Sequence, residues 1–243
     1  PLAQALLNQG YRVKGSTTSL EKIPVLQKMG IFSFCLQVSD DVKGEGVADF
    51  FQSDLVVITL PFCRDFADPC QYQEQIAGVV LQCVKSKKVR RVIFTSSTSV
   101  YPDNLKTATE DLEFKTDNAR SKVLRDIEKE LLGNKNFSAT IVRLAGLYGP
   151  QRKIGGFLAG KKELSGANKR VNLIHQDDAV GIIQVIINQD AGGEIFNGCS
   201  DHHPTRKELY CAAARQMGLA VPEFCDEKEV VSKIVSNEKV KKV

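Results

Sequence analysis

The chain has 243 residues, of which 42% are hydrophobic and 26% charged. At about 150 residues per domain this length corresponds to one or two domains, and the composition is that of an ordinary globular protein, which excludes disorder, a collagen-like repeat and a coiled coil. The 33 basic residues exceed the 29 acidic ones by four and are scattered. Because nucleic-acid-binding proteins concentrate positive charge on one stripe, we expect no nucleic-acid partner.

The longest apolar run, residues 55–61, is far shorter than the ~20 residues that cross a bilayer, and the first residues do not have the pattern of a signal peptide. The seven cysteines are an odd number with no Cys-x-x-Cys pair, which argues against a disulfide framework and against a zinc site. These features predict a cytoplasmic protein with no membrane partner and no bound metal.

Helical and extended patterns alternate from the first residues on. Residues 2–7 are predicted to form a helix that stops near Gly10, and residues 11–14 a strand that ends at Gly15. A second helix is predicted over residues 19–29, where Pro24 should shorten the first turns. The next strand is predicted over residues 31–36.

The middle of the chain continues this alternation with more apolar strands. Residues 55–58 form an unbroken, mostly β-branched run, which is typical of a strand buried on both faces of a parallel sheet. The elements predicted after it are helix 71–86, strand 89–95, helix 117–132 and strand 137–143. Strands that alternate with helices indicate an α/β fold with a doubly wound parallel sheet of Rossmann type.

The regular alternation of helical and extended patterns stops after residue 147. Gly and Lys are concentrated in residues 155–162, which suggests a lid or an insertion. Regular structure is predicted to resume with strand 171–174, helix 177–187, strand 194–197 and helix 205–217. His175 is expected to order the start of the helix with Asp177 as the N-cap, rather than to act as a base.

Ligands of a doubly wound sheet bind beyond the carboxyl ends of its strands. The first predicted strand is followed by Ser16, Thr17 and Thr18, with Lys22 nearby and no acid. An acid there would bind the ribose hydroxyls of NAD and repel a 2′-phosphate, whereas hydroxyls and a cation accept that phosphate. The segment favours NADP, and the alternative is a polar turn with Ser19 as N-cap.

A second polar strand end spans residues 94–101, Phe-Thr-Ser-Ser-Thr-Ser-Val-Tyr. It resembles the short-chain dehydrogenase/reductase superfamily, in the extended or atypical branch related to NAD-dependent epimerases and dehydratases, where a strand ends in Ser-Ser-x-x-Val-Tyr. Residues 143–150, 171–178 and 193–197 are similar, in the same order, to three further segments of that branch. The chain is most similar to an uncharacterised bacterial group of NAD(P)-binding proteins.

The resemblance implies an NAD(P)-binding protein that acts on a small molecule as an oxidoreductase or as a sugar-nucleotide epimerase or dehydratase. It also implies a homodimer, which is common in the family. A Ser or Thr hydroxyl of the family holds the reacting group of the substrate, and Ser97 matches that position. The cofactor-binding positions that we infer are Ser16, Thr17, Thr18, Thr59, Leu60, Thr95, Ser96, Lys122, Leu144 and Ala145.

The resemblance also divides the chain and places a pocket. Residues 1–146 are expected to form the NAD(P)-binding domain, and residues 147–243 a smaller substrate-side region from which residues 171–198 return to the main sheet. The substrate pocket is expected between Ser97, Tyr148 and residues 155–162, with Tyr148 packing beside the cofactor.

Two features of the branch are not found. The Gly-rich turn after the first strand would precede residue 1, and residues 231–242 resemble the helix before the C-terminal tail, so the chain is expected to be truncated at both ends. The Tyr-x-x-x-Lys pair is missing, and the matching segment runs from Asn118 to Lys122. An amide does not titrate in the useful range, so Asn118 cannot replace the tyrosine as proton donor.

Lys122 either binds the nicotinamide ribose or is an ordinary surface lysine. Two functions therefore stay open. In the first, the protein is an enzyme in which Ser97 orients the substrate, and water or another group moves the proton. In the second, it is a non-catalytic NADPH-binding sensor or a protein that docks to a partner.

Overall fold

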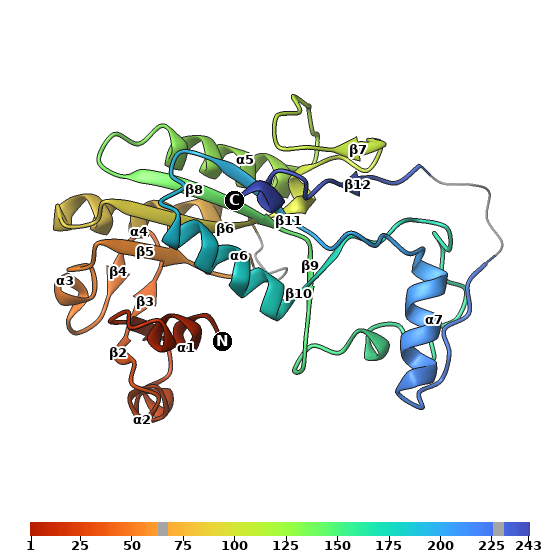
Figure 1. The fold of residues 1–243 in the computed structure, drawn as a ribbon, viewed down its shortest axis with the longest axis horizontal. Coiled ribbons are helices and arrows are strands. Elements are labelled where there is room, and N and C mark those ends of the chain that lie inside the picture. Colours follow the sequence, from red (N-terminus) through yellow and green to blue (C-terminus); the bar gives the residue numbers. More distant parts are fainter. Residues whose placement is uncertain (63–67, 226–230) are drawn as a thin grey trace. The chain divides into compact units, whose positions relative to one another are not determined.

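The computed structural model describes residues 1–62, 68–225 and 231–243 (Figure 1). The helices of this part are α1 Leu2–Asn8, α2 Ile23–Lys28, α3 Val47–Phe50, α4 Cys70–Ser86, α5 Ala119–Leu132, α6 Gln176–Asn188 and α7 Arg206–Gln216. The 3₁₀ turns are η1 Leu20–Lys22, η2 Thr98–Val100, η3 Ile154–Gly156 and η4 Val240–Lys242. The strands are β1 Lys14–Thr17, β2 Phe32–Cys35, β3 Gln37–Val38, β4 Val42–Lys43, β5 Leu55–Ile58, β6 Arg91–Ser97, β7 Thr107–Ala108, β8 Ser138–Leu144, β9 Gly146–Tyr148, β10 Leu173–His175, β11 Ile195–Gly198 and β12 Ile234–Val235.

The chain divides into two compact units. The first unit comprises Pro1–Ser96, Asp117–Val142 and Val180–Ile195. The second unit comprises Ser97–Thr116, Arg143–Ala179 and Phe196–Val243.

Four strands form the main parallel sheet, in the order β11-β8-β6-β5. β5 and β6 pair in parallel, from Leu55 opposite Arg91 to Ile58 opposite Phe94. Three consecutive residues of β6 are at most 1% exposed, namely Val92, Ile93 and Phe94. Burial of successive residues requires cover on both faces, which confirms the predicted α/β class with a doubly wound parallel sheet.

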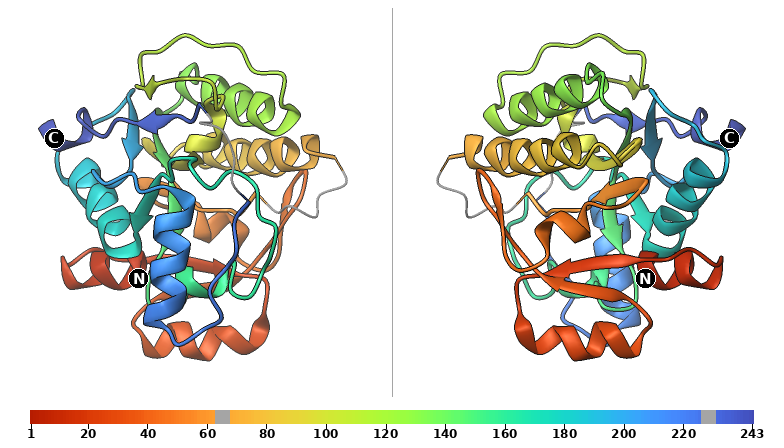
Figure 2. Two further views of the ribbon diagram at one scale, coloured as in Figure 1. Left: turned by 90° about the vertical axis from the view of Figure 1, so that its right-hand side faces the viewer. Right: turned by 90° about the vertical axis from the view of Figure 1, so that its left-hand side faces the viewer.

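Two long helices of the first unit, α4 and α5, run side by side, as both views in Figure 2 show. Their buried residues recur every three or four positions, so each helix is amphipathic and turns one apolar stripe inward. The buried side chains of α4 include Tyr72, Ile76, Val79, Val80 and Cys83, and those of α5 include Val123, Leu124, Ile127 and Leu131.

The first strand lies three residues later than predicted. β1 and β2 form their own parallel pair, in which Lys14 lies opposite Phe32 and Thr17 opposite Cys35. Gly15 was expected to end the strand, but it lies inside it because pairing with β2 outweighs the low strand propensity of glycine. Ser16 and Thr17 therefore belong to the carboxyl end of the strand itself.

The starts of three helices depend on caps and on proline. Pro24 lies in the first turn of α2, and residues 20–22 form only the 3₁₀ turn η1, in agreement with the predicted shortening. α5 begins at residue 119 rather than 117 because Asn118 is its N-cap. The prediction that Asp177 caps α6 is wrong, since α6 begins at Gln176 and the amide of Asp177 donates to Nδ1 of His175 at 3.2 Å.

The last residues of the chain form a strand instead of the expected helix. Ile234 and Val235 make up β12, which pairs in parallel with β7 in the same unit. The amide of Ile234 donates to the carbonyl of Lys106 at 3.1 Å, and the amide of Ser236 donates to the carbonyl of Ala108 at 2.9 Å. Only Val240–Lys242 forms a helical turn, because β-branched residues next to an unpaired strand favour pairing.

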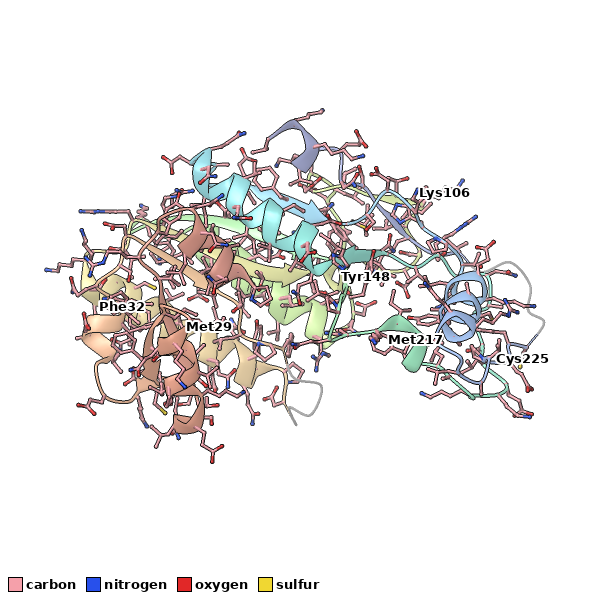
Figure 3. The ribbon with its side chains drawn as sticks, turned by 60° about the horizontal axis from the view of Figure 1, so that its bottom comes forward. Met29, Phe32, Lys106, Tyr148, Met217 and Cys225 are labelled. Carbon is pink, nitrogen blue, oxygen red and sulfur yellow. The ribbon has the colours of Figure 1, made fainter. Side chains whose placement is uncertain are left out.

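In the second unit, α7 packs closely on the turn η3. Gly155 is buried, and a Cβ atom added to it would lie 2.5 Å from the carbonyl oxygen of Ala213 and 2.7 Å from Sδ of Met217. Only glycine allows this approach, which fixes the helix that carries Arg206 and Tyr210. Figure 3 labels Met217 at the carboxyl end of this helix.

Six cysteines lie in the described part of the chain and none forms a disulfide, whereas Cys63 lies outside it. Within residues 1–62, 68–225 and 231–243, no helix is both long and apolar enough to cross a membrane. The same part of the chain contains no group of three His, Cys, Asp or Glu side chains that could hold a metal ion.

Candidate functional site

The carboxyl end of β1 presents two exposed hydroxyls in the first unit. Ser16 and Thr18 are exposed, while Oγ1 of Thr17 accepts a hydrogen bond of 3.2 Å from the amide of Ser19. Ser19 precedes the turn η1, but its side chain makes no capping hydrogen bond. The hydroxyls of Ser16 and Thr18 are therefore the ones that face solvent at this strand end.

Side chains of α4 and α5 hold the segment that follows β5. The hydroxyl of Tyr72 donates to the carbonyl of Leu60 at 2.8 Å, and the Tyr72 ring stacks on Phe62 with the ring centroids 4.4 Å apart. The guanidinium of Arg120 lies 3.9 Å from the centre of the Phe62 ring and donates to the Phe62 carbonyl at 3.0 Å. The stack fixes Leu60 beside the exposed Thr59.

The hydroxyls at the end of β6 point alternately to the two faces of the strand. Oγ of Ser96 donates to Oε1 of Glu128 on α5 at 2.6 Å, and both residues are buried, with exposures of 6% and 2%. Oγ1 of Thr95 donates to the carbonyl of Ile58 on β5 at 3.2 Å. The Ser96 hydroxyl is thus engaged inside the first unit.

Replacing Ser96 by Ala is expected to lower the free energy of unfolding by about 1–3 kcal/mol, because it removes a donor from the buried Glu128 carboxyl group. Chemical denaturation would measure the change. The exposed Ser165→Ala variant is the matched control, and its effect should stay within about 0.5 kcal/mol. Equal stabilities of the Ser96→Ala variant and the control would contradict a structural role for this hydrogen bond.

Asn118 and Lys122 lie one turn apart at the start of α5. Oδ1 of Asn118 accepts hydrogen bonds from the amide and the hydroxyl of Ser121, at 3.1 and 3.3 Å. Its amide group therefore satisfies a free N–H at the helix start, which is the usual task of an N-cap. Lys122 is exposed. The catalytic and cofactor-binding roles of these two residues stay predictions.

Ser97 ends β6 and begins the second unit. Its Oγ accepts a hydrogen bond of 3.1 Å from the amide of Ser99, which caps the turn η2 and fixes the side chain. Because Oγ is the acceptor in this bond, the hydroxyl proton is available to the oxygen of a ligand.

A cavity of about 330 Å³ lies in the second unit beside Ser97. The residues that line it come from five segments of this unit and are Ser97, Thr98, Ser99, Asp103, Gly146, Lys169, Arg170, Val171, Asn172, Arg206, Tyr210, Ser232 and Lys233. Such a volume is within the usual range of small-molecule sites.

Neither Tyr148 nor residues 155–162 line this cavity, so the pocket expected between them and Ser97 stays a prediction. The ring of Tyr148, labelled in Figure 3, packs edge-on against that of His175 with the centroids 5.1 Å apart. Gly155 packs under α7 instead. The cavity wall is built by the residues before β10, the first turns of α7 and the residues before β12.

A buried network holds the residues just after Ser97. The hydroxyl of Tyr101 donates to Oδ1 of Asn197 at 3.0 Å and accepts from Nη1 of Arg143 at 2.7 Å. The amide of Asn197 donates to the carboxylate of Glu110 at 2.7 Å. Burial raises the pKa of the Tyr101 phenol, so it remains a neutral donor to Asn197.

Asn172 connects the cavity to the last strand. Its Nδ2 donates to the carbonyl of Lys233 at 3.0 Å, and its Oδ1 accepts from the amide of Val235 at 2.9 Å. Both ends of the amide are thus engaged with the segment that carries Lys233. Nζ of Lys233 in turn donates to the carbonyl of Tyr101 at 2.5 Å.

The sequence analysis selected Ser97, which lines this cavity, but missed the charged residues of the cavity wall. Lys169 and Arg170 were visible as a basic pair before a predicted strand, and Arg206 as the residue after a capping-box Thr205. Lys233 carried no signal of its own. Only the tertiary fold brings these distant segments to one wall.

Comparisons with known proteins agree with this architecture. The profile of the NAD dependent epimerase/dehydratase family matches residues 2–198. The protein YeeZ of Escherichia coli (strain K12) is 34% identical over 226 residues, which cover 92% of this chain and 82% of YeeZ.

Solved structures resemble the chain over nearly its whole length. A functionally unknown conserved protein from Silicibacter pomeroyi superposes with a TM-score of 0.79 at 21% identity, covering 99% of this chain and 86% of that one. MoeE5, solved in complex with UDP-glucuronic acid and NAD, superposes with a TM-score of 0.74 at 17% identity, covering 100% of this chain and 87% of that one. At these identities the likeness shows the fold alone.

Proposed function

Because the chain belongs to the NAD-dependent epimerase/dehydratase family, we propose that it is an NAD(P)-dependent oxidoreductase or a sugar-nucleotide-modifying enzyme that acts on a small molecule. The observation that carries the proposal is the position of Ser97. Its side chain is fixed by the Ser99 amide, retains a proton to donate, and lines a cavity of about 330 Å³. We assign to Ser97 the task of holding the reacting oxygen of the substrate.

The strand ends of the first unit fit a dinucleotide cofactor. The exposed hydroxyls of Ser16, Thr18 and Thr59 lie at the carboxyl ends of β1 and β5, where ligands of this fold class bind. Thr17, Leu60, Thr95 and Ser96 have their polar groups engaged within the chain, so we assign them contact through the backbone or by packing. That Leu144 and Ala145 also contact the cofactor stays a prediction. The nicotinamide, when bound, supplies the chemistry of hydride transfer.

NADP is the cofactor that we favour over NAD. Ser16 and Thr18 place exposed hydroxyls, and no carboxylate, at the end of β1. A carboxylate at this position would bind the ribose hydroxyls and repel a 2′-phosphate.

Replacing Ser16 by Asp is therefore expected to weaken NADPH binding about tenfold or more and to leave NADH binding equal or stronger, because the new charge repels the 2′-phosphate. Fluorescence titration of the reduced cofactors would measure both affinities. Ser16→Asn is the control, since it keeps a similar size without charge. Equal losses for NADPH and NADH would place the 2′-phosphate elsewhere.

Proton transfer is the step for which this chain lacks the Tyr-x-x-x-Lys pair of the family's pattern. Asn118 occupies the position that the tyrosine would hold, and its side chain caps α5. An amide neither takes up nor releases a proton in the useful range. We propose that Ser97 orients the substrate while water or a second polar group moves the proton, and that Lys122 binds the nicotinamide ribose.

The presence of Asn118 in place of the tyrosine also favours a second, non-catalytic function. If no group replaces the tyrosine, the protein is a non-catalytic NADPH-binding sensor or docking protein. The two functions differ in turnover but share cofactor binding.

Transfer of deuterium separates them. In one arm the protein is incubated with carbonyl compounds and NADPH that carries deuterium at C4 of the nicotinamide. In a second arm it is incubated with the oxidised cofactor and with sugars and sugar nucleotides that carry deuterium on the carbons bearing hydroxyls. Mass spectrometry follows the label, and the enzyme function predicts its transfer to a carbonyl compound in the first arm or away from its original carbon in the second. Tight NADPH binding with no deuterium transferred to any compound favours the sensor.

A further inference from the structure

The cavity beside Ser97 carries more positive than negative charge. Among the described residues that line it, Lys169, Arg170, Arg206 and Lys233 are cationic and Asp103 alone is acidic. The carboxylate of Asp103 lies 3.2 Å from Nζ of Lys233 and 3.9 Å from Nζ of Lys169. One negative charge is thus shared between two lysines.

The two arginines are oriented by backbone carbonyls. Nη1 of Arg170 donates to the carbonyl of His203 at 3.1 Å, and Nη1 of Arg206 donates to the carbonyl of Ser165. A carbonyl fixes a guanidinium without cancelling its charge, and the remaining N–H groups can still donate.

Glu208, the acidic residue in the first turn of α7, is engaged in capping that helix. The hydrogen bonds from the amide and hydroxyl of Thr205 lower the pKa of Glu208, and the charge of Arg170 contributes less. Glu208 and Thr205 form the capping box of α7, and Glu208 does not line the cavity. The cavity wall therefore keeps an excess of cations that an anionic ligand can balance.

We infer that the substrate held at Ser97 carries a phosphate monoester, which Arg170 and Arg206 bind. This inference rests on the proposed function and specifies its substrate class. A guanidinium offers parallel N–H donors that match the oxygens of a phosphate, and a dianion suits the excess of positive charge. Ser97 lines the same cavity and would hold the hydroxyl or carbonyl to be oxidised or reduced.

The size of the cavity favours a compact molecule. Its volume of about 330 Å³ lies near the lower end of the ~300–1,000 Å³ that is usual for ligand sites. A phosphorylated sugar or polyol suits this volume better than a sugar joined to a nucleoside diphosphate.

Isothermal titration calorimetry on the protein saturated with NADPH, at constant ionic strength, tests the inference. The ligands are glucose 6-phosphate, glucose, gluconate and UDP-glucose. Glucose 6-phosphate is expected to bind, glucose to give no signal, and Arg170→Gln and Arg206→Gln each to weaken binding about tenfold. Saturation with NADPH prevents phosphate from binding at the proposed 2′-phosphate position.

Two further variants guard against misreading a damaged fold. Arg215 lies on α7, is exposed and does not line the cavity, so the Arg215→Gln variant should leave binding of glucose 6-phosphate unchanged. Asp103→Asn removes the one acid of the wall and should tighten binding of glucose 6-phosphate, a gain that misfolding cannot produce. Equal affinities of the wild type, Asp103→Asn and both arginine variants would overturn the inference, as would tighter binding of UDP-glucose or gluconate.

The outcome is separable from that of the proposed function. If NADPH binds and deuterium reaches a neutral product while glucose 6-phosphate fails to bind, only the substrate class is wrong. If glucose 6-phosphate binds with the predicted effects of the variants while deuterium is never transferred, the anion site stands and the enzyme function fails.

Discussion

The Ser97→Ala variant is expected to lose about 10²- to 10³-fold in turnover while its affinity for NADPH stays unchanged. The Ser97 hydroxyl accepts from the Ser99 amide and so keeps its proton for a ligand oxygen in the cavity. A donor held in place before the reaction stabilises the charge that develops on that oxygen. The loss should therefore appear mainly in kcat.

Steady-state kinetics with the substrate found by deuterium transfer would measure this loss, and fluorescence titration would measure the NADPH affinity. Ser39→Ala is the control, because Ser39 is exposed and does not line the cavity. Turnover of Ser97→Ala within about threefold of the control would remove Ser97 from the mechanism, since even one lost neutral hydrogen bond of about 1 kcal/mol changes a rate by more than that.

The Arg143→Met variant is expected to lower the free energy of unfolding by about 3 kcal/mol, the largest structural effect that we predict. Arg143 is 4% exposed, donates to the hydroxyl of Tyr101, and holds its guanidinium 4.9 Å from the centre of the same ring. Its removal leaves the Tyr101 oxygen and the carboxylate of Glu110 in a buried network with one cation fewer. Chemical denaturation would measure the change.

A double-mutant cycle shows whether the effect passes through this hydrogen bond. Tyr101→Phe alone should cost about 1–3 kcal/mol, and the double variant should cost at least 0.5 kcal/mol less than the sum of the two, roughly the coupling expected of residues in contact. Tyr11→Phe removes a hydroxyl that bonds to Asn188 from a residue 41% exposed, and it serves as the control. Additive losses would contradict a shared network behind Ser97.

Much of the fold could be predicted because hydrophobic patterns in this chain are locally clear. The run at residues 55–58 became the strand Leu55–Ile58, and the amphipathic pattern at residues 71–86 became the helix Cys70–Ser86. In both elements, most of the buried residues are apolar residues that predicted the strand or the helix. β1 was placed too early because Gly15 is a poor strand former in isolation, and pairing with β2 is a tertiary effect.

The site could be predicted only at strand ends. Ser97 ends a buried strand in a dense run of hydroxyls, and the resemblance of this run to the Ser-Ser-x-x-Val-Tyr segment of the family selected it. Lys169, Arg206 and Lys233 lie far apart in the sequence, so their convergence on one cavity depends on how α7 and β12 pack within the second unit. The short strand β12 was predicted as part of a helix. Its strand conformation depends on pairing with β7, in which Ile234 lies opposite Thr107, 127 positions upstream, and a local pattern does not reveal such a partner.

Binding of the reduced cofactors tests the central claim most directly, because it requires no substrate. The protein is titrated with NADPH and with NADH in parallel, and cofactor fluorescence is recorded on a sample whose folding is verified by circular dichroism. Saturable binding of NADPH, with NADH at least about tenfold weaker, is the result expected from the exposed hydroxyls of Ser16 and Thr18. A folded protein that binds neither cofactor would contradict the proposed redox function.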